Sequence, residues 1–205
     1  MQRHFTLKVL PGLAVAMAVW AAGGTPAVAQ APLTIDSAHI TINGTSNIHP
    51  YTASTSTLRV TRAQVAAAAE GDTWAAVLKT GYVDGFEVTI PAATLTSPRE
   101  GLDKNMHKAL QVTEHPDIVF RLVRLEPGSG TAMRGIGRLT IAGVEREVAL
   151  DLTAERRGQT LCIEGRVQLL MTDFGIKPPT AMLGMLKTDP KVTVTFETVL
   201  SVPTT

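Results

Sequence analysis

The sequence predicts an all-β fold with short helices, in which an antiparallel barrel of about eight strands encloses an apolar cavity. Three observations favour this class. Apolar and polar residues alternate along most of the chain, as in strands with one buried face. Short glycine-containing turns separate the segments of the second half, and Gly135, Gly137 and Gly165 fall on the predicted inner face. A single closed barrel and a strongly curved sheet both satisfy these patterns.

Residues 1–29 are typical of a secretory signal peptide. A short basic region precedes an apolar run over residues 9–22, and Ala27-Val28-Ala29 places small residues where a signal peptidase cleaves. An uncleaved membrane anchor is the alternative, but the apolar run is short for spanning a bilayer. We therefore expect cleavage after Ala29, export to the periplasm and one mature domain over residues 30–205.

The first half of the mature chain predicts three strands. Residues 33–36 and 40–42 alternate between apolar and polar side chains, and the following Asn-Gly-Thr-Ser-Asn at residues 43–47 predicts a turn or bulge. Residues 51–61 predict a second strand. Residues 86–90 predict a third, which the next residue, a proline, limits or bends.

Residues 101–110 differ from their neighbours because their apolar positions recur at helical spacing. They predict a short helix that crosses the sheet or closes one end of the barrel. A run of hairpins follows, with turns at the glycine-containing segments between strands. The predicted strands of this run are residues 118–122, 133–141, 148–152 and 161–171.

The last part of the chain combines a turn, a predicted helix and a strand. Asp173-Phe174-Gly175 turns the chain, and Pro178 and Pro179 prevent further strand pairing. Thr180 can then cap a short apolar helix over residues 180–186, and residues 192–196 alternate as a final strand. We expect this helix to act as a plug or lid at one end of the barrel.

The inner-face glycines bear on whether the barrel is hollow. A glycine lets a sheet bend and leaves room inside, and an eight-stranded barrel can either fill with side chains or hold one ligand. The missing side chains favour a cavity. The alternative is that bulky residues of neighbouring strands fill the gaps.

The charge balance gives no electrostatic basis for binding nucleic acid or an anionic membrane surface. The whole chain has 19 Lys+Arg and 18 Asp+Glu, and loss of the two basic residues in segment 1–29 leaves 17 against 18, a net charge of −1. No second apolar run is long enough to span a bilayer after cleavage.

No residues show the spacing of a catalytic or metal site. The lone Cys162 cannot form an internal disulfide and is predicted to point out of the barrel, and Asp173 is interpreted as a turn residue. No phosphate-binding loop and no nucleophile elbow occur. The histidines of the mature chain lack paired metal spacing, and we interpret all four as structural. They are His39, His49, His107 and His115.

Several short motifs together resemble the YceI-like family. They are Ile35-Asp36-Ser37-Ala38, Lys108-Ala109-Leu110, His115-Pro116-Asp117-Ile118-Val119-Phe120, the Gly-Arg-Leu-Thr-Ile-Ala-Gly-Val hairpin at residues 137–144, and Asp173-Phe174-Gly175-Ile176. The resemblance extends over nearly the whole mature domain. It implies a lipocalin-like antiparallel barrel that binds a polyisoprenoid or a similar long-chain amphiphile, and it raises the expectation of a homodimer.

Two segments depart from the family pattern. Many members carry a His-rich segment such as F-x-V-x-H where this chain has residues 42–51, and many begin a helix with R-D-x-H-L where it has residues 102–110. Both segments fall near the place where a ligand head group would enter. The resemblance therefore leaves the head group open.

The main hypothesis is a non-enzymatic periplasmic binding or carrier protein for a polyisoprenoid or fatty-acid-like lipid held inside the barrel, without metal or other cofactor. One alternative is a non-catalytic envelope or stress module in which the same apolar residues form a filled core. Another is an enzyme or redox accessory that acts on a bound lipid. The predicted cavity-lining residues are Phe86, Val88, Ile90, Ile118, Phe120, Leu122, Leu139, Ile141, Val148, Leu150, Leu152, Leu161, Ile163, Val167, Leu169, Met171, Met182, Leu183, Val192, Val194 and Phe196.

Overall fold

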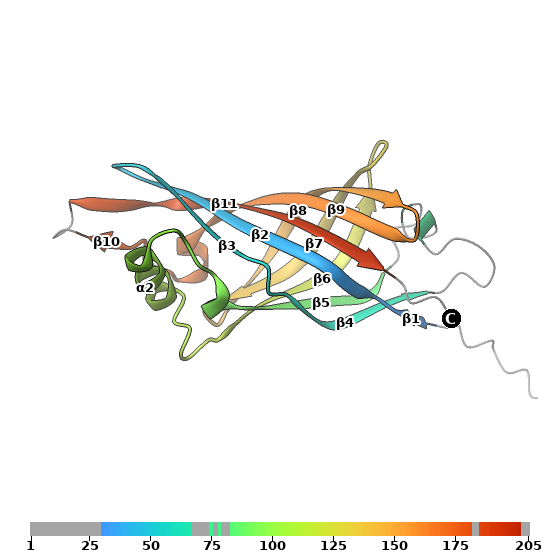
Figure 1. The fold of residues 1–205 in the computed structure, drawn as a ribbon, viewed down its shortest axis with the longest axis horizontal. Coiled ribbons are helices and arrows are strands. Elements are labelled where there is room, and N and C mark those ends of the chain that lie inside the picture. Colours follow the sequence, from blue (N-terminus) through green and yellow to red (C-terminus); the bar gives the residue numbers. More distant parts are fainter. Residues whose placement is uncertain (1–29, 67–73, 76–77, 79–82, 182–184, 202–205) are drawn as a thin grey trace, which may run out of the picture.

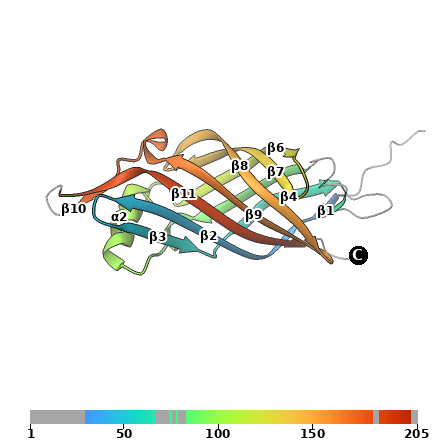
Figure 2. The ribbon, with the colours of Figure 1, turned by 90° about the horizontal axis from the view of Figure 1, so that it is seen from above.

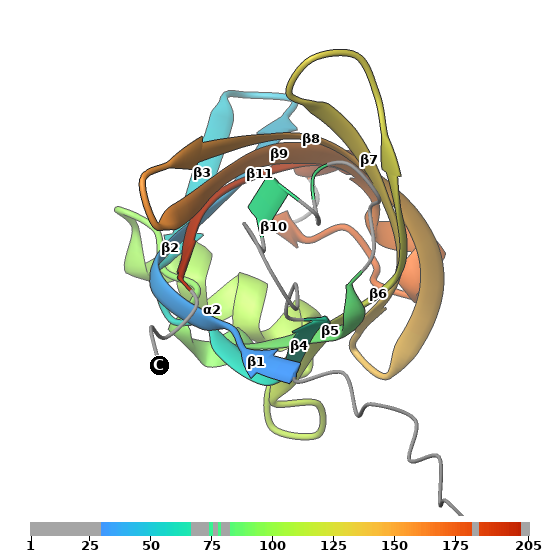
Figure 3. The ribbon, with the colours of Figure 1, turned by 90° about the vertical axis from the view of Figure 1, so that its right-hand side faces the viewer.

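A computed structural model describes residues 30–66, 74–75, 78, 83–181 and 185–201. Its strands form one antiparallel sheet that curls into a barrel, in the order β1-β4-β5-β6-β7-β8-β9-β11-β2-β3, with β10 paired to β11 (Figures 1 and 3). The strands are β1 (Gln30–Pro32), β2 (Thr34–Ser46), β3 (Pro50–Thr55), β4 (Arg59–Ala66), β5 (Asp84–Pro91), β6 (Asp117–Pro127), β7 (Ala132–Ile141), β8 (Val144–Arg157), β9 (Thr160–Leu170), β10 (Thr180–Ala181) and β11 (Leu186–Ser201). The helical elements are η1 (Ala92–Thr94), α2 (Glu100–Ala109) and η2 (Met171–Phe174).

The sheet closes in two places. Strands β1 and β2 are separated only by Leu33. Because β1 pairs with β4 and β2 pairs with β11, this continuous stretch joins the first strand of the order to the β11–β2 side. The Leu33 N–H also donates to the Ala63 carbonyl at 3.4 Å. Towards the other end, Ser54 of β3 exchanges two backbone hydrogen bonds with Thr96, at 2.8 and 3.0 Å.

The barrel has two distinct ends. At one, which we call the α2 end, lie α2, η2, the β2–β3 turn and β10 (Figures 1 and 2). At the other, the Trp74 end, lie β1 and the β6–β7 and β8–β9 turns (Figures 1 and 2). Trp74, which is only 3% exposed, belongs to this end because its indole N–H donates to the Gln159 carbonyl in the β8–β9 turn. Each end has its own buried cluster, built around Phe174 and Leu95 at the α2 end and around Trp74 and Met133 at the Trp74 end.

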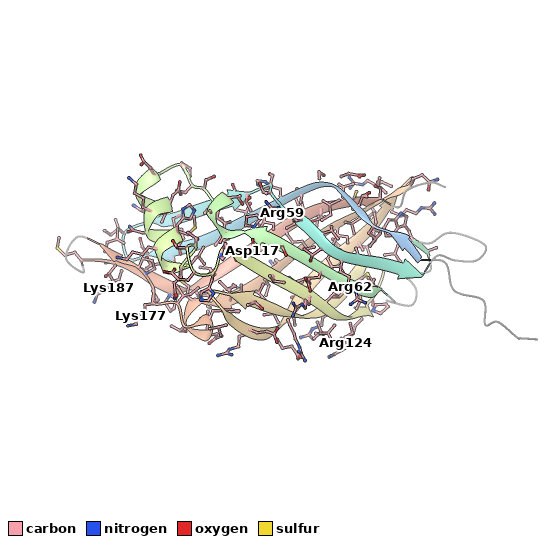
Figure 4. All side chains as sticks on the ribbon, turned by 90° about the horizontal axis from the view of Figure 1, so that it is seen from below. Arg59, Arg62, Asp117, Arg124, Lys177 and Lys187 are labelled. Atoms are coloured by element: carbon pink, nitrogen blue, oxygen red, sulfur yellow. The ribbon has the colours of Figure 1, made fainter. Side chains whose placement is uncertain are left out.

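Alternation places apolar side chains inside and charged ones outside. In the β9–β11 pair, Leu161 lies opposite Leu200 and Val167 lies opposite Val194, all four on the inner face. Figure 4 shows charged side chains, such as Arg59 and Arg124, on the outer wall. No helix among the described residues is both long and apolar enough to cross a membrane.

Most predicted elements are confirmed. The helix predicted over residues 101–110 is α2, and the predicted hairpins are β6 to β9. The strand predicted over residues 51–61 is instead two strands, because the Thr57 N–H turns back to the Thr55 hydroxyl at 3.0 Å and interrupts the pairing. The turn predicted at residues 43–47 begins later than expected, because β2 runs to Ser46. The Ser46 hydroxyl accepts hydrogen bonds from the N–H groups of Ile48 and His49.

The predicted helix over residues 180–186 is wrong. Thr180 and Ala181 form strand β10 and pair antiparallel with Lys187 and Leu186 of β11, so both ends of the predicted helix are strands. Figures 1 and 2 show β10 and the start of β11 beyond α2 at this end of the barrel. The paired prolines hold the chain extended, and the Pro179 carbonyl accepts from the Thr188 N–H at 3.1 Å, which continues the pairing. Met182 and Leu183 lie outside the described residues.

The inner-face glycines do not leave open space. A Cβ at Gly137 would overlap the ring of Phe120, and a Cβ at Gly165 would overlap the ring of Phe196. In each pair the aromatic residue comes from the neighbouring strand. The interpretation that these glycines enlarge the cavity is therefore wrong, and the alternative, that bulky neighbours fill the gaps, holds at both positions.

Candidate functional site

The barrel encloses an apolar cavity of about 230 Å³ that extends to the Trp74 end. Apolar cavities of roughly 150 Å³ in other proteins stay dry and bind small hydrocarbons. Most of the lining residues lie on β2, β5, β6, β7, β8, β9 and β11, and the others come from connecting segments and from the helical positions Trp74 and Leu78. They are Leu33, Ile40, Ile42, Leu58, Trp74, Leu78, Val83, Phe86, Val88, Ile90, Leu95, Ile118, Phe120, Leu122, Leu125, Met133, Leu139, Ile141, Leu150, Leu152, Ala154, Leu161, Ile163, Val167, Leu169, Val194, Phe196, Thr198 and Leu200.

The wall of this cavity has almost no hydrogen-bonding capacity. Thr198 carries the one hydroxyl among the lining residues, and no lining residue is ionisable. The indole N–H of Trp74 is already committed, because it donates to the Gln159 carbonyl at 2.9 Å. The cavity can therefore hold an apolar group, whereas a buried charge or an unpaired polar group would be costly there.

Trp74 lines one end of the cavity. Its side chain is almost fully buried against Met133, Leu161 and Leu200. The hydrogen bond to Gln159 ties it to the β8–β9 turn, so the indole is fixed at both its apolar and its polar edge.

A second, smaller cavity of about 110 Å³ lies beneath α2. It shares five aliphatic residues with the first, so the two chambers lie end to end along the barrel with a layer of side chains between them. The shared residues are Ile42, Ile118, Ile141, Leu169 and Val194. Leu102 and Met106 of α2 cover the second chamber, and Tyr51 and Thr188 bring hydroxyl groups to it.

The structure brings most of the predicted lining residues together. Met171 and Val192 line the second chamber, whereas Val148 lines neither chamber and packs against the cluster at the α2 end. Met182 and Leu183 lie outside the described residues. The first cavity is lined by the rest of the predicted set: Phe86, Val88, Ile90, Ile118, Phe120, Leu122, Leu139, Ile141, Leu150, Leu152, Leu161, Ile163, Val167, Leu169, Val194 and Phe196.

Sequence reasoning missed several lining residues for identifiable reasons. A bulge in β2, between its pairs with Val199 and Leu200, reverses which residues face inward, so the phase of Leu33 does not extend to Ile40. A second bulge in β6 moves Leu125 inward. The remaining missed residues include Met133, Ala154 and Leu200, which continue the alternation of predicted strands and could have been found by extending it.

Three of the four histidines have structural contacts. The His107 ring Nε2 lies 2.8 Å from the Leu95 carbonyl, and His39 Nδ1 lies 3.1 Å from the Ser56 hydroxyl. The His115 ring packs against the β7–β8 turn. His49 is different, because one of its ring nitrogens contacts Arg99 and the other is buried without a partner among the described residues.

Cys162 lies on the outer face of β9, as predicted, between Glu155 of β8 and Val199 of β11. It is half-buried and does not line either cavity. Asp173 is exposed within η2, and the turn ends at Gly175, whose left-handed φ of 69° suits glycine. Within the described part of the chain, no group of three or more His, Cys, Asp or Glu residues could hold a metal ion.

The outer wall carries a cross-strand charge network on β5, β6, β7 and β8. Arg121 pairs with Glu87 and lies 3.9 Å from Glu145, which also lies 3.6 Å from Arg138. The hydrogen bond from Arg121 lowers the pKa of Glu87 below its ordinary value of 4.5. These groups face solvent, so the network belongs to the surface and not to the cavity.

The fold matches solved structures of low sequence identity. Burkholderia cenocepacia BcnA aligns with a TM-score of 0.62 at 14% identity, covering 79% of this chain and 95% of that one. A polyisoprenoid binding domain from Saccharophagus degradans aligns with a TM-score of 0.60 at 12% identity, covering 84% and 99%. The Campylobacter jejuni YCEI protein aligns with a TM-score of 0.53 at 15% identity, covering 73% and 85%.

Sequence comparison gives a family-level result. No curated protein matches the chain. The model of the YceI-like domain matches residues 33–200, from the closing residue of the barrel to the last part of β11. This match covers most of the chain, and the chain therefore belongs to the YceI-like family.

Proposed function

We propose that this protein is an exported, non-enzymatic binding or carrier protein for a long-chain apolar amphiphile, a polyisoprenoid or a fatty-acid-like lipid, held inside the barrel. The observation that carries the proposal is the cavity wall, which offers apolar side chains and a single hydroxyl. The similar domain from Saccharophagus degradans, described as binding polyisoprenoid, supports the same class of ligand.

The free energy of such binding depends mainly on how many carbons of the chain are buried. Each methylene removed from water contributes about 0.8 kcal/mol. A chain that buries about fifteen carbons therefore gains about 12 kcal/mol, from which the cost of association, about 4–15 kcal/mol, is subtracted. Tight binding consequently requires a long chain that occupies both chambers. That occupation needs only rotation of the aliphatic side chains that separate the chambers, such as Ile118 and Leu169.

The lining residues also favour binding over catalysis. General acid–base or nucleophilic chemistry needs an ionisable or nucleophilic group beside the reacting atoms. The wall of the main cavity supplies none among its lining residues. A chain bound there would be sheltered from water without being held against a reactive side chain.

Export is the second part of the proposal. The signal-peptide pattern of residues 1–29 supports it. The intact mass of the protein recovered from a periplasmic extract tests this. A mature chain beginning at Gln30 is expected, and a product that retains residues 1–29 would contradict it.

The ligand is tested by identifying what co-purifies and by blocking the space it would fill. The mature protein is extracted with organic solvent, and the extract is analysed by mass spectrometry for long-chain species. In Val167→Phe, a larger side chain enters the cavity at a residue that is only half-buried although it faces inward. Gln168→Phe adds the same ring to the outer face of the same strand and is the matched control.

The two variants give opposite expectations. Val167→Phe should lose most of the bound lipid while its melting temperature stays close to that of the parent, and Gln168→Phe should retain the lipid. Absence of any long-chain species from parent and variants, with no uptake of added lipid, would reject the carrier function. That result would favour a filled structural module.

A further inference from the structure

The contact between Arg99 and His49 at the α2 end leaves one ring nitrogen of His49 without a hydrogen-bond partner among the described residues. Arg99 precedes α2, and its Nη1 lies 2.9 Å from Nε2 of His49 in the β2–β3 hairpin. A guanidinium can only donate, so Nε2 accepts and the ring proton resides on Nδ1. That Nδ1 is buried and has no hydrogen-bond partner among the described residues. Buried donors of this kind are rarely left unpaired, so the group calls for an acceptor beyond the described residues, which a bound ligand can supply.

The positive charge of Arg99 is not neutralised by the acids beside it. Glu100 pairs with Lys104 at 2.8 Å, and the Asp103 carboxylate accepts from the Ser97 N–H at 2.7 Å. Within the described part of the chain, Arg99 makes no ion pair with a carboxylate. The guanidinium is therefore available to an anion.

Tyr51 connects these donors to the apolar interior. Its phenol lines the second chamber and lies over Gly44, where a Cβ would overlap the ring. The Ser46 N–H donates to the His49 carbonyl at 3.1 Å, so strand-like pairing continues past β3. His49 and Tyr51, two residues apart, therefore point to the same face of the hairpin.

The phenol of Tyr51 is a neutral donor. Burial raises its pKa above the ordinary 10.0, and the charge of Asp189 raises it further. Asp189 is the acidic group near this face, and its carboxylate accepts from the Lys191 N–H at 2.8 Å, so it has a partner within its own strand.

We infer that Arg99, His49 and Tyr51 bind the anionic oxygen head group, a carboxylate or a phosphate, of an amphiphile whose chain lies in the barrel. This inference rests on the proposed function and specifies its ligand. The three groups provide a cation and two neutral donors, and one of these donors, Tyr51, lines the second chamber. Anionic oxygens accept stronger hydrogen bonds from such groups than neutral oxygens do. The head group stays at the α2 end, and the tail points towards Trp74.

The test compares ligands that differ only in the head group. Dodecanoate is compared with dodecanol, and farnesyl phosphate with farnesol, each by displacement of a fluorescent apolar probe from the mature protein. Arg99→Gln removes the cation, and Lys108→Gln removes one cation from the last turn of the same helix as a matched control. The first pair of ligands tests the carboxylate and the second tests the phosphate.

The expected result is a preference of about tenfold for the charged member of at least one pair, because hydrogen bonds to charged groups are the stronger class. Arg99→Gln should abolish this preference, and Lys108→Gln should keep it. No preference in either pair, or a preference that Arg99→Gln retains, would overturn the head-group site. Failure of the parent to bind any of the four compounds would instead reject the carrier function itself.

Discussion

Gly137 provides a sharp test of how the barrel interior is packed. In Gly137→Ala the new methyl group would overlap the ring of Phe120 and lie 2.7 Å from the carbonyl oxygen of Arg121. The ring can rotate, but the carbonyl belongs to the paired strand β6 and moves only if the sheet distorts. Overpacking of this kind costs about 1–3 kcal/mol. For a domain of this size, that corresponds to a loss of roughly 2–12 °C in melting temperature.

Gly135→Ala is the matched control, two residues earlier on the same face of β7. Its Cβ would meet only side-chain atoms, the nearest being Leu152 Cδ2 at 3.3 Å. A small rotation of that leucine relieves the contact, and replacing glycine removes backbone entropy from the unfolded chain. This variant should remain within about 0.5 kcal/mol of the parent or exceed it slightly.

The assay is thermal unfolding of both variants, followed by circular dichroism. A double variant, Phe120→Leu with Gly137→Ala, removes the ring but keeps the carbonyl contact. We therefore expect the double variant to lose less stability than the sum of the losses of the two single variants. It should still be less stable than Phe120→Leu alone, because the carbonyl contact remains. Equal melting temperatures for Gly135→Ala and Gly137→Ala would refute the packing of Phe120 over Gly137.

Three further predictions concern other parts of the barrel. Trp74→Ala should lower the free energy of unfolding by about 3–5 kcal/mol and speed the release of a bound apolar probe in stopped-flow displacement. Trp74→Phe should keep the slow release. Unchanged release in Trp74→Ala would show that the indole is not a barrier at this end of the cavity. Cys162→Ser should leave the melting temperature and lipid content nearly unchanged, and a large loss of either would place the thiol inside the barrel. The lowered pKa of Glu87, caused mainly by Arg121, should contribute stability above about pH 4.5 that is lost as the pH falls through the lower folded-state pKa. Because the Arg121–Glu87 pair is exposed, its pH-dependent contribution to the free energy of unfolding should be less than about 1 kcal/mol, and Glu87→Gln should remove it. An unchanged acid-unfolding curve in Glu87→Gln would show that the pair does not contribute to stability.

Period-two alternation predicted the inner wall because each long strand has one buried face. Val88, Phe120, Leu150 and Phe196 were assigned to the cavity on that basis, and all four line it. The method works wherever a strand runs without interruption. It fails where a bulge adds one residue, as in β2 and β6, because one extra residue exchanges the two faces and leaves no mark in the composition.

The error at residues 180–186 has a different cause. The local sequence has good helix formers after a capping threonine, but pairing with the start of β11 places Thr180 opposite Lys187. Long-range pairing therefore overrode local propensity. The glycines were misinterpreted because the residue that fills the space at Gly165 is Phe196, thirty-one positions away and adjacent only in the folded sheet.

The proposed head-group donors could not be found from spacing. Arg99 and His49 are 50 residues apart and meet because the Thr96 backbone pairs with β3. His49 and Tyr51 lie in residues 42–51, one of the two segments that depart from the family pattern, and Arg99 lies shortly before the other, residues 102–110. That departure located the region of these donors, although the histidine itself was interpreted as structural.

The pairing of β2 with β11 also determines when the barrel can form. Thr34 and Ser201 are 167 positions apart, and their side chains share a hydrogen bond across the seam between the first and last long strands. Contacts of such long sequence separation make folding slow, because a large loop must close before they form. A nascent chain cannot complete the barrel until its last strand has been synthesised. Closure of the barrel therefore follows the synthesis of β11, and the seam between β2 and β11 stays open while the chain is being made.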